Sequence, residues 1–416
     1  MEDLARIKLF QAYGVELEYM IVDQDTLAVK PVANKLFKDL LGREGNEIEY
    51  PVVSLSNELA LHIVEMKTTQ PTADLSNLKD AFHKMVMHLN ERLNQFGAKL
   101  LPTAAHPFMK PHKETRLWPN ENSEIYQTYD RIFSCKGHGW SNLQSTHINL
   151  PFANDHEFEK LHAAIRIILP LIPALCASSP ILGGKKTGYY DTRLRYYQQN
   201  QKLIPSICGD VIPEPIFTEA DYKAQVFDRI KQDLKPFDTL EILEPIWVNS
   251  RGAIARFDRG AIEIRLIDIQ ESVSSDLAIV CLITEAIKML VSGRMIPLEE
   301  QKKVPTNQLV SILQSTIKDG NKAILTECAY LSIFGLEHTS RDVKGRDVWQ
   351  RILEDLLKNN NRPLEDWKVP LTVLLDQGTL SHRILKAIDG KPTKKKLQKV
   401  YDHLSRCLHY DQMFLV

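Results

Sequence analysis

Four short segments of the chain alternate apolar side chains with charged or imidazole side chains, which is the pattern of strands that bury one face. These segments are residues 14–19, 62–66, 146–150 and 261–266. Because alternate side chains of an extended chain share a face, Glu16 and Glu18 are expected to stand about 7 Å apart on one side of the first segment. Glu263 and Arg265 share a face of the fourth segment for the same reason. Acids placed in this way repel one another unless a cation lies between them.

A helix is predicted between residues 72 and 97, after the second strand. Thr72 is the expected N-terminal cap and Gly97 the expected end. Residues 99–103 then predict another strand. The apolar positions of the helix recur every three or four residues, as in a helix that packs one face on a sheet, at Leu75, Leu78, Phe82, Met85, Leu89, Leu93 and Phe96.

Two apolar stretches, residues 165–182 and 277–291, are predicted to be buried helices. Arg166 and three prolines interrupt the first stretch, and Glu285 and Lys288 interrupt the second. Both stretches are therefore shorter or more polar than the about 20 apolar residues that a membrane span requires. No membrane partner is expected.

The remaining segments alternate between loops and helices. Residues 111–139 lack sustained periodicity and predict a long loop with one helix at 125–133. Residues 178–215 are rich in Gly, Pro, Tyr and Arg, and a loop of this length inside a compact domain is usually functional. From residue 297 onward the pattern is mostly helical. It ends in a helix at 394–408, whose lysine-rich start is expected to be solvated.

The composition is that of a folded protein with a well-buried core. The 416 residues are 44% hydrophobic, and no internal repeat or low-complexity linker divides them. One domain is therefore predicted over residues 1–416, with a catalytic sheet and helices at 1–295 and a mainly helical portion at 296–416. The 52 basic and 53 acidic residues balance, so the total charge suggests no nucleic-acid partner. A homo-oligomer is left open.

The cysteines and the first residues indicate a cellular compartment. The six cysteines are far apart and include no CxxC pair, as expected of reduced, mostly buried thiols in a cytosolic enzyme. Residues 1–6 lack the basic-then-apolar order of a signal peptide. A cytoplasmic location is therefore predicted.

The acidic segments predict metal and nucleotide chemistry. Carboxylates with a single imidazole suit Mg²⁺ or Mn²⁺, and such metals together with arginines are the general solution for phosphoryl transfer from ATP. Neither GxxxxGK[ST] nor GxGxxG occurs, which disfavours a P-loop nucleotide fold and a dinucleotide enzyme. The candidate clamps for phosphate or carboxylate groups are Arg193, Arg195, Arg256, Arg259 and Arg265.

Each segment taken alone also fits a purely structural interpretation. Glu16 and Glu18 suit the solvated side of an amphipathic strand, and His147 suits an ordinary hydrogen-bonded residue. Glu263 and Arg265 suit a surface ion pair that contributes little. The coincidence of four segments favours function, because each lies among apolar neighbours that predict burial, where an unpaired charge is costly.

The ordered set of segments resembles the glutamate-cysteine ligases and the related bacterial carboxylate-amine ligases. Residues 14–18 resemble the G-[VI]-E-x-E opening of that family, and Glu58 with Glu65 resembles its second acidic strand. Residues 146–149 resemble its H-x-[NH] strand, and residues 261–268 resemble its I-E-[VI]-R-x-x-D strand. Further similar segments are His106-Pro107-Phe108, Ser178-Ser179-Pro180 and the Tyr- and Arg-rich stretch around Arg193.

The resemblance, which runs in order over residues 14–268, implies an α+β fold like the catalytic domain of glutamine synthetase. Its antiparallel sheet would be backed by helices and would hold Mg²⁺ (or Mn²⁺) and ATP on its concave face. Arg193 and Arg265 would contact phosphate or the substrate carboxylate as catalytic residues. Arg195, Arg256 and Arg259 are the further candidates for binding ATP. The implied metal ligands are Glu16, Glu18, Glu58, Glu65, His147 and Glu263.

The implied reaction joins a carboxylate to an amine in two steps, as in glutathione biosynthesis. The γ-carboxylate of glutamate takes the γ-phosphoryl group of ATP, and the amine of cysteine or another amino acid then attacks the acyl phosphate. Asn149, where many relatives carry a second histidine, and the insertion-like residues 198–215 leave the amine open. Two alternatives remain, a phosphagen-kinase-like phosphotransferase and a non-catalytic nucleotide- or metal-binding regulator.

Overall fold

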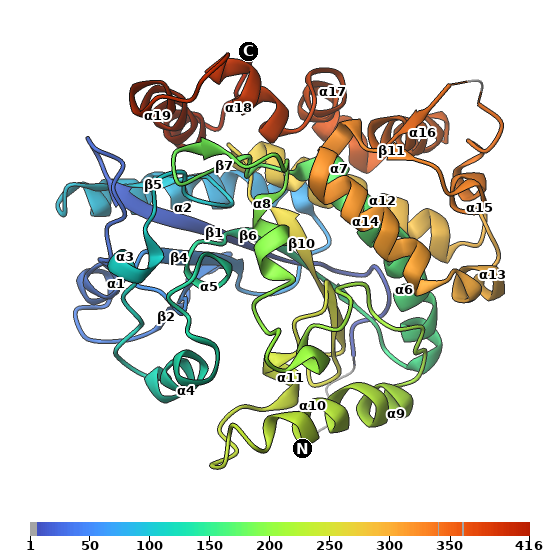
Figure 1. Cartoon of the computed structure of the whole chain (residues 1–416), viewed down its shortest axis with the longest axis horizontal. Helices are drawn as coiled ribbons and strands as arrows, with labels where there is room; N and C mark the ends of the chain where they lie inside the picture. The colour runs from blue at the N-terminus through green and yellow to red at the C-terminus, as the bar shows by residue number, and fades with distance from the viewer. Residues whose placement is uncertain (1–5, 340, 360–361) are drawn as a thin grey trace.

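The centre of the molecule is an eight-stranded antiparallel sheet (Figure 1). The structure is a computed structural model that describes residues 6–339, 341–359 and 362–416. The strand order is β2-β3-β4-β1-β6-β10-β9, and β5 pairs with the C-terminal end of β1. The strands are β1 (Gly14–Asp23), β2 (Glu47–Ile48), β3 (Val53–Asn57), β4 (Ile63–Thr68), β5 (Ala98–Leu101), β6 (Ser145–Pro151), β9 (Ala253–Arg256) and β10 (Ala261–Asp268). All four acidic segments predicted as strands are confirmed.

The alternation along β1 divides the sheet into an apolar face and a polar face. Val15, Leu17 and Tyr19 are fully buried in the main hydrophobic cluster, whereas Glu16 and Glu18 point to the opposite face. The fold is therefore α+β with an antiparallel sheet, as predicted.

Long helices cover the apolar face. Helix α12 (Val273–Val291) contacts α2 (Leu75–Asn94) and α6 (Asp155–Ile168), and α2 also contacts β3 and β4. Most of α12 is apolar and buried on every side, which explains its sequence without a membrane. Among the described residues, no helix is both long and apolar enough to cross a bilayer. The buried helices predicted at 277–291 and within 165–182 are confirmed, the latter as the end of α6 and α7 (Ile172–Cys176).

The last third of the chain is mainly helical. A second hydrophobic cluster joins α18 and α19 to the far end of β1, where Met20 and Val22 replace the acids of the polar face. A small pair of strands, β11 (Ile324–Leu325) and β12 (Val343–Lys344), interrupts the helices. The helices are α13 (Leu298–Lys303), α14 (Thr306–Asp319), α15 (Cys328–Leu331), α16 (Gly345–Lys358), α17 (Lys368–Gln377), α18 (Leu380–Ile388) and α19 (Lys394–Tyr410). The start of α19 is exposed, as expected.

Some local predictions are wrong in detail. The cap of α2 is Asp74 rather than Thr72, because the Asp74 carboxylate accepts hydrogen bonds from the backbone N–H groups of Ser76 and Asn77. The helix predicted at 125–133 is confirmed as part of α4. Besides α4 (Ser123–Phe133), the expected loops contain short elements that were not predicted, namely α3 (Pro111–Glu114), α5 (His138–Ser141), β7 (Ile181–Leu182), β8 (Lys185–Lys186) and α8 (Thr192–Tyr197).

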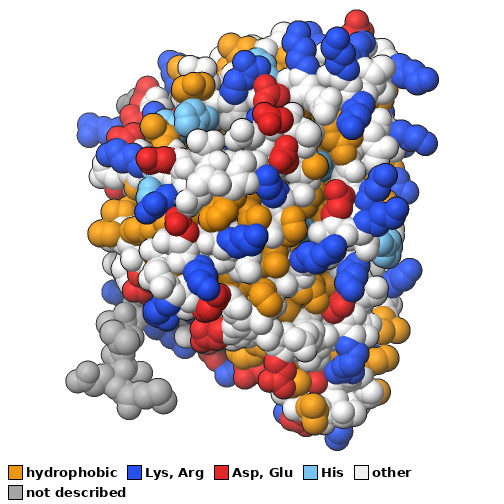
Figure 2. All heavy atoms as spheres, turned by 90° about the vertical axis from the view of Figure 1, so that its left-hand side faces the viewer, with side chains coloured by type: hydrophobic (Ala, Val, Ile, Leu, Met, Phe, Trp, Pro, Cys, Tyr) orange, Lys and Arg blue, Asp and Glu red, His pale blue; other side chains and the backbone are white. Residues whose placement is uncertain are grey.

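A lobe below the sheet in Figure 1 is formed by residues between α8 and β9. Its helices are α9 (Glu219–Tyr222), α10 (Asp228–Leu234) and α11 (Pro245–Val248). Helix α1 (Ala33–Leu41), at the left in Figure 1, contacts β2. The face shown in Figure 2 carries basic, acidic and apolar side chains side by side, consistent with a net charge of −1.

Candidate active site

Four neighbouring strands place the predicted site residues opposite one another. In the register of the sheet, Glu16 of β1 faces His147 of β6, and Glu18 of β1 faces Glu65 of β4. Glu263 of β10 faces Asn149 of β6. The alternation of each strand therefore brings its polar side chains to a common face, although 247 residues separate the first of them from the last (263 − 16).

His147 is at the centre of these carboxylates. Its Nδ1 atom lies 3.0 Å from Glu16 Oε2 and 3.7 Å from Glu263 Oε1. Its Nε2 atom lies 2.9 Å from the hydroxyl of Ser145. The amide of Asn149 donates a 3.0 Å hydrogen bond to the other oxygen of Glu16. The imidazole and the Glu16 carboxylate are thus held in fixed orientations.

Glu18 and Glu65 are also oriented by short hydrogen bonds. Glu18 Oε2 accepts from the backbone N–H of Ser145 at 2.7 Å and from its hydroxyl at 2.9 Å. Glu65 Oε1 accepts from the hydroxyl of Ser56 at 2.6 Å. Both carboxylates are over nine-tenths buried. Their burial next to each other is costly unless a cation or a proton compensates the charge.

The pKa values of the acids reflect this crowding. Burial raises the pKa of Glu65 to about 8, and the neighbouring charges of Glu16 and Glu18 add to the shift. Burial, together with Glu18 and Glu65, raises the pKa of Glu58 well above its usual range. Burial also acts on Glu16, but the hydrogen bond and charge of His147, with Arg265, lower its pKa to about 2.

The pKa of His147 shifts in the matching direction. Burial and the charge of Arg265 lower it, but the hydrogen bond that the imidazole donates to Glu16 and the charges of Glu18 and Glu16 outweigh them, so that the pKa of the imidazole is raised. The surrounding carboxylates therefore favour the protonated, positively charged form of the imidazole.

The donor set fits a divalent cation. Two triads offer ligand atoms within 4.8 Å of one another, Glu16–His147–Glu263 and Glu18–Glu65–His147. They contain five of the six predicted ligands, while Glu58 lines the adjacent cavity beside Glu18. Carboxylate oxygens with one imidazole suit Mg²⁺ or Mn²⁺, and a bound cation would remove the repulsion that raises the pKa of Glu65.

A cavity of about 210 Å³ opens next to the triads. Glu18, Glu58, His147 and Arg265 are among the residues that line it. An aromatic wall closes it, consisting of Tyr126, Tyr129, Trp140 and Tyr197. The cavity therefore combines acidic side chains, a guanidinium and apolar surface, which is the composition of a pocket for a small polar ligand.

Arg265 and Arg256 both reach the Glu263 carboxylate. Arg265 forms an ion pair with Glu263 Oε1, and Arg256 Nη1 lies 3.7 Å from Glu263 Oε2. Burial opposes the charge of Arg265, but Glu263 and other neighbouring groups raise the pKa of its guanidinium well above its usual value. Arg256 also pairs with Asp258 at 2.8 Å. Both arginines are thus placed beside a candidate metal ligand.

The other three predicted arginines differ in their surroundings. Arg193 lines the cavity, but its side chain is only 2% exposed and forms an ion pair with Asp268. Arg195 is exposed and lies 4.1 Å from the ring centre of Tyr189. Arg259 is exposed in the turn between β9 and β10. The roles assigned to these arginines stay predictions.

Sequence reasoning missed residues that complete the site. Asp268 belongs to the fourth motif but has no predicted role there, although it binds Arg193 and the segment at 178–179. The aromatic wall comes from α4, α5 and α8, and of these only α4 was predicted as a helix, without a role in the site. Only the clustering of Tyr and Trp in those segments was a usable signal.

The whole arrangement matches a known family of proteins. The model of the glutamate-cysteine ligase family 2 matches residues 12–403 of the chain. The chain belongs to this family. The glutamate-cysteine ligase family 2 consists of ATP-dependent carboxylate-amine ligases, and ATP and Mg²⁺ are used across it.

Two relatives illustrate the range of similarity within the family. An uncharacterized protein of Archaeoglobus fulgidus is 31% identical over 402 residues, covering 97% of this chain and 100% of its own length. A putative glutamate–cysteine ligase 2 of Salinispora tropica is 27% identical over 219 residues, covering 52% of each chain. The chain thus matches about half the length of that second relative.

A solved structure shares the fold. The glutamate–cysteine ligase of Francisella tularensis in complex with AMP has a TM-score of 0.58 and 11% sequence identity, with 97% of this chain and 90% of that chain covered. At this identity the likeness concerns the fold alone. The α+β architecture of this member of family 2 is that of a glutamate-cysteine ligase, like glutamine synthetase, as predicted.

Proposed function

We propose that this protein is an ATP-dependent ligase that joins the side-chain carboxylate of glutamate to the amine of cysteine or another amino acid. The observation that carries the proposal is the pair of carboxylate–histidine triads beside a cavity that Arg265 lines. Family membership supports the reaction class. The name of the Salinispora relative supports glutamate and cysteine as the substrates to test first.

The proposed reaction proceeds through an acyl phosphate. A glutamate carboxylate oxygen attacks the γ-phosphorus of ATP, the bond from that phosphorus to the β–γ bridging oxygen breaks, and ADP leaves. The amine nitrogen then attacks the carbonyl carbon, phosphate leaves, and the nitrogen loses a proton as the amide forms. Activation is needed because a carboxylate is a poor electrophile and amide formation is uphill in water.

The side chains of the polar face would divide the work between binding and charge stabilisation. The predicted metal ligands would hold Mg²⁺ or Mn²⁺, which when bound neutralises charge on the triphosphate. The planar guanidinium of Arg265 would engage the transferred phosphoryl group or the substrate carboxylate with two parallel hydrogen bonds. Arg256, which lies 3.7 Å from Glu263, would bind ATP, as would Arg195 and Arg259 at the exposed edges.

Measuring ADP release with each substrate omitted in turn tests the proposal. A ligase releases ADP at full rate only when glutamate, an amine and Mg²⁺-ATP are all present. Release with a single acceptor and no amine would indicate a phosphotransferase of the phosphagen-kinase kind. No release with any combination would indicate a nucleotide- or metal-binding regulator. A panel of amino-acid amines in the same assay identifies the acceptor, and only a cysteine product would support a role in glutathione biosynthesis in the cytoplasm.

Arg265→Lys tests the proposed phosphoryl contact. Lysine keeps the charge but loses the planar fork, so kcat should fall by about tenfold or more while the KM for ATP changes little. A kcat within about twofold of the parent would leave Arg265 as a mere partner of Glu263.

A further inference from the structure

Arg265 lies on a bulge in β10, directly opposite His147. Ile264 pairs with Ile148, but the next pairing on β10 is Ile267 with Thr146. Arg265 and Leu266 therefore stand opposite the single residue between those two partners, which is the definition of a β-bulge. Bulges occur next to active sites because the extra residue redirects a side chain.

The bulge changes which residues of β10 face the core. Ile262, Ile264 and Leu266 belong to the main hydrophobic cluster, as strict alternation requires. Ile267 belongs to the same cluster, although alternation would have placed it on the polar face beside Arg265. The extra residue thus brings Asp268, which pairs with Ser145, to the polar face, where it binds Arg193.

The backbone of Arg265 is held on both sides. Its N–H donates a 2.9 Å hydrogen bond to the carbonyl of Gly252. Its carbonyl accepts hydrogen bonds from both terminal nitrogens of Arg193, at 3.3 and 3.4 Å. A side chain at Gly252 would meet the side chain of Leu266 at 2.8 Å, so the close approach of these two segments requires a glycine.

Arg193 is itself held in place by several hydrogen bonds. Its Nε donates to Asp268 Oδ1, and its backbone N–H donates to the Ser179 hydroxyl at 3.0 Å. The second oxygen of Asp268 accepts from the Ser178 backbone at 2.7 Å and from the Ser179 hydroxyl at 3.0 Å. All three nitrogens of the Arg193 guanidinium therefore bond within the protein, to Asp268 and to the Arg265 carbonyl.

We propose that Arg193 is a positioning residue that acts on the reaction only through Arg265, by holding the bulge that directs the Arg265 guanidinium toward Glu263 and the cavity. This inference rests on the proposed ligase function. It replaces the expectation that Arg193 itself contacts phosphate. It also gives a role to the Ser178-Ser179-Pro180 motif, which anchors Asp268 and through it Arg193.

A double-mutant cycle of Arg193→Lys and Arg265→Lys tests the proposal. If Arg193 acts only through Arg265, Arg193→Lys should lower kcat by about tenfold with the KM for ATP nearly unchanged, and the double variant should be no slower than Arg265→Lys alone. If Arg193 contacts a substrate directly, the two losses multiply and the proposal is overturned. Arg166→Lys is the matched control, since Arg166 is a fully buried arginine bonded to the carbonyl of Pro213, and it should leave kcat unchanged.

Hydrogen exchange at the Arg265 amide gives a readout that does not depend on activity. Loss of the Arg193 contact should speed exchange of this amide by about tenfold or more, because the bulge then opens locally, whereas Arg166→Lys should not. Ser179→Ala, which removes one bond each from Asp268 and Arg193, should show a smaller acceleration and serves if Arg193→Lys does not fold. Unchanged exchange in every folded variant overturns the proposal. If the parent protein releases no ADP, the proposed ligase function is contradicted instead. The exchange data then still test whether Arg193 holds the bulge.

Discussion

Two groups of buried carboxylates lie close together in this molecule, and they differ in what surrounds them. The site carboxylates are Glu16, Glu18, Glu65 and Glu263, and the structural carboxylates are Asp268, Glu271 and Asp276. The site carboxylates face one another and share a single histidine. The structural carboxylates are each surrounded by donors from other elements.

The donors of the structural carboxylates are specific and numerous. Glu271 and Arg383, both fully buried, form an ion pair, and the backbone N–H of Phe414 donates to Glu271 at 3.2 Å. Asp276 accepts from the Thr146 hydroxyl at 2.7 Å and from the Gln270 backbone at 3.0 Å. These contacts fasten the C-terminal segment and α12 to the sheet.

The comparison teaches how to separate a structural acid from a ligand-binding acid. Both groups are buried, so burial does not distinguish them. A raised pKa does not distinguish them either, since burial raises the pKa of Asp276 as well as that of Glu65. The arrangement of the oxygens does: the structural carboxylates each bind donors from other elements, whereas the site carboxylates converge in two triads whose ligand atoms lie within 4.8 Å of one another. Several acids that converge in this way form a place for a cation.

The largest expected effect comes from breaking a structural carboxylate's ion pair. Arg383→Met leaves Glu271 buried without its cation, which should lower the free energy of unfolding by about 3–5 kcal/mol. Urea denaturation at pH 7.5 measures this loss. Adding Glu271→Met removes the stranded charge and should restore most of the stability. A single-variant loss under about 1 kcal/mol would show that water or a shifted proton compensates Glu271 instead.

The opposite pattern is expected for a site carboxylate. Glu65→Gln should lower the ligation rate by about 100-fold or more, because a candidate metal ligand is lost. The metal-free variant should be about as stable as the parent, because a pKa of about 8 keeps the metal-free Glu65 carboxyl mostly protonated at neutral pH, and glutamine is likewise uncharged. Thermal melts with and without Mg²⁺-ATP, alongside the ADP assay, test both parts. Unfolding at 25 °C in the presence of metal would instead make Glu65 a structural residue.

A neutral buried group should respond to acid. His106 Nε2 donates to the Leu27 carbonyl at 2.7 Å, and its Nδ1 accepts from the Phe108 backbone at 3.2 Å, so the neutral ring has both nitrogens satisfied. Burial lowers the pKa of His106 to about 4. Between this value and the unfolded value near 6.5, only the unfolded chain binds the proton, so stability is lost as the pH falls.

The magnitude of that loss follows from proton linkage. His106 alone should cost the native state about 1.4 kcal/mol between pH 7.5 and pH 5.5. His106→Gln keeps a donor for Leu27 without titrating, so its urea midpoint should depend less on pH than that of the parent. Equal pH dependence of the two proteins would contradict the assignment of a neutral ring.

Strand periodicity was enough to predict much of the site. Glu16 and Glu18 share the polar face, as their alternation predicted, whereas the pairing of Glu16 with His147 and of Glu18 with Glu65 follows from the register of the sheet. The periodicity does not indicate which strands are neighbours, because β1 pairs with β4, β5 and β6, which come from distant parts of the chain. The resemblance implied an antiparallel sheet without a strand order, so that part of the fold came only with the structure.

Other features depend on contacts that no local pattern encodes. The bulge at Arg265 arises where Gly252 and Arg193 meet β10, and residues 261–268 alone predict uninterrupted alternation. Asp74 displaced Thr72 as the cap of α2 because either residue suits the position, and the choice depends on where the first helical N–H groups point. The helix at 125–133 was predicted, but not that its tyrosines line the cavity, and α5 is too short for periodicity to resolve.

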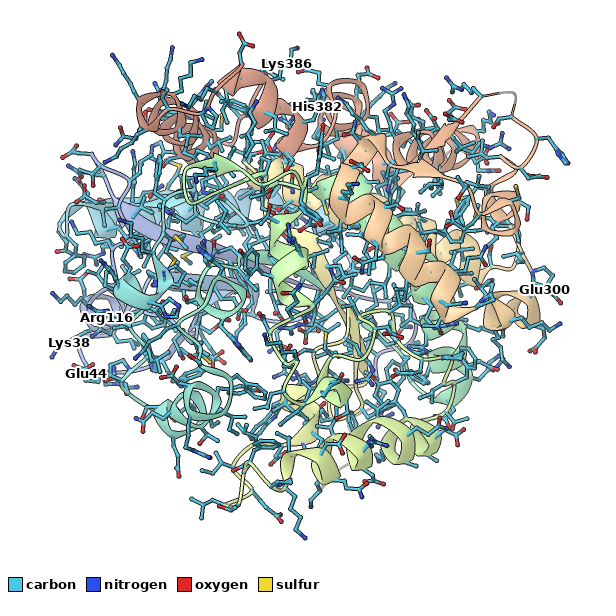
Figure 3. All side chains as sticks on the ribbon, viewed as in Figure 1. Lys38, Glu44, Arg116, Glu300, His382 and Lys386 are labelled. Atoms are coloured by element: carbon cyan, nitrogen blue, oxygen red, sulfur yellow. The ribbon has the colours of Figure 1, made fainter. Side chains whose placement is uncertain are left out.

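The smallest effect is expected where an ion pair is exposed. Lys38 and Glu44 lie together at the left edge of the molecule in Figure 3, and their charged atoms are 2.9 Å apart. More than half of each side chain is in contact with solvent, so water screens the pair and replaces it when it is broken. Glu44→Gln keeps the size of the side chain and a hydrogen-bonding oxygen for Asn120. Its melting temperature and its rate of ADP release should therefore match those of the parent, at low salt as well as at high salt. A clear fall in either quantity would mean that distance between opposite charges, rather than burial and donor supply, decides which carboxylates of this protein matter.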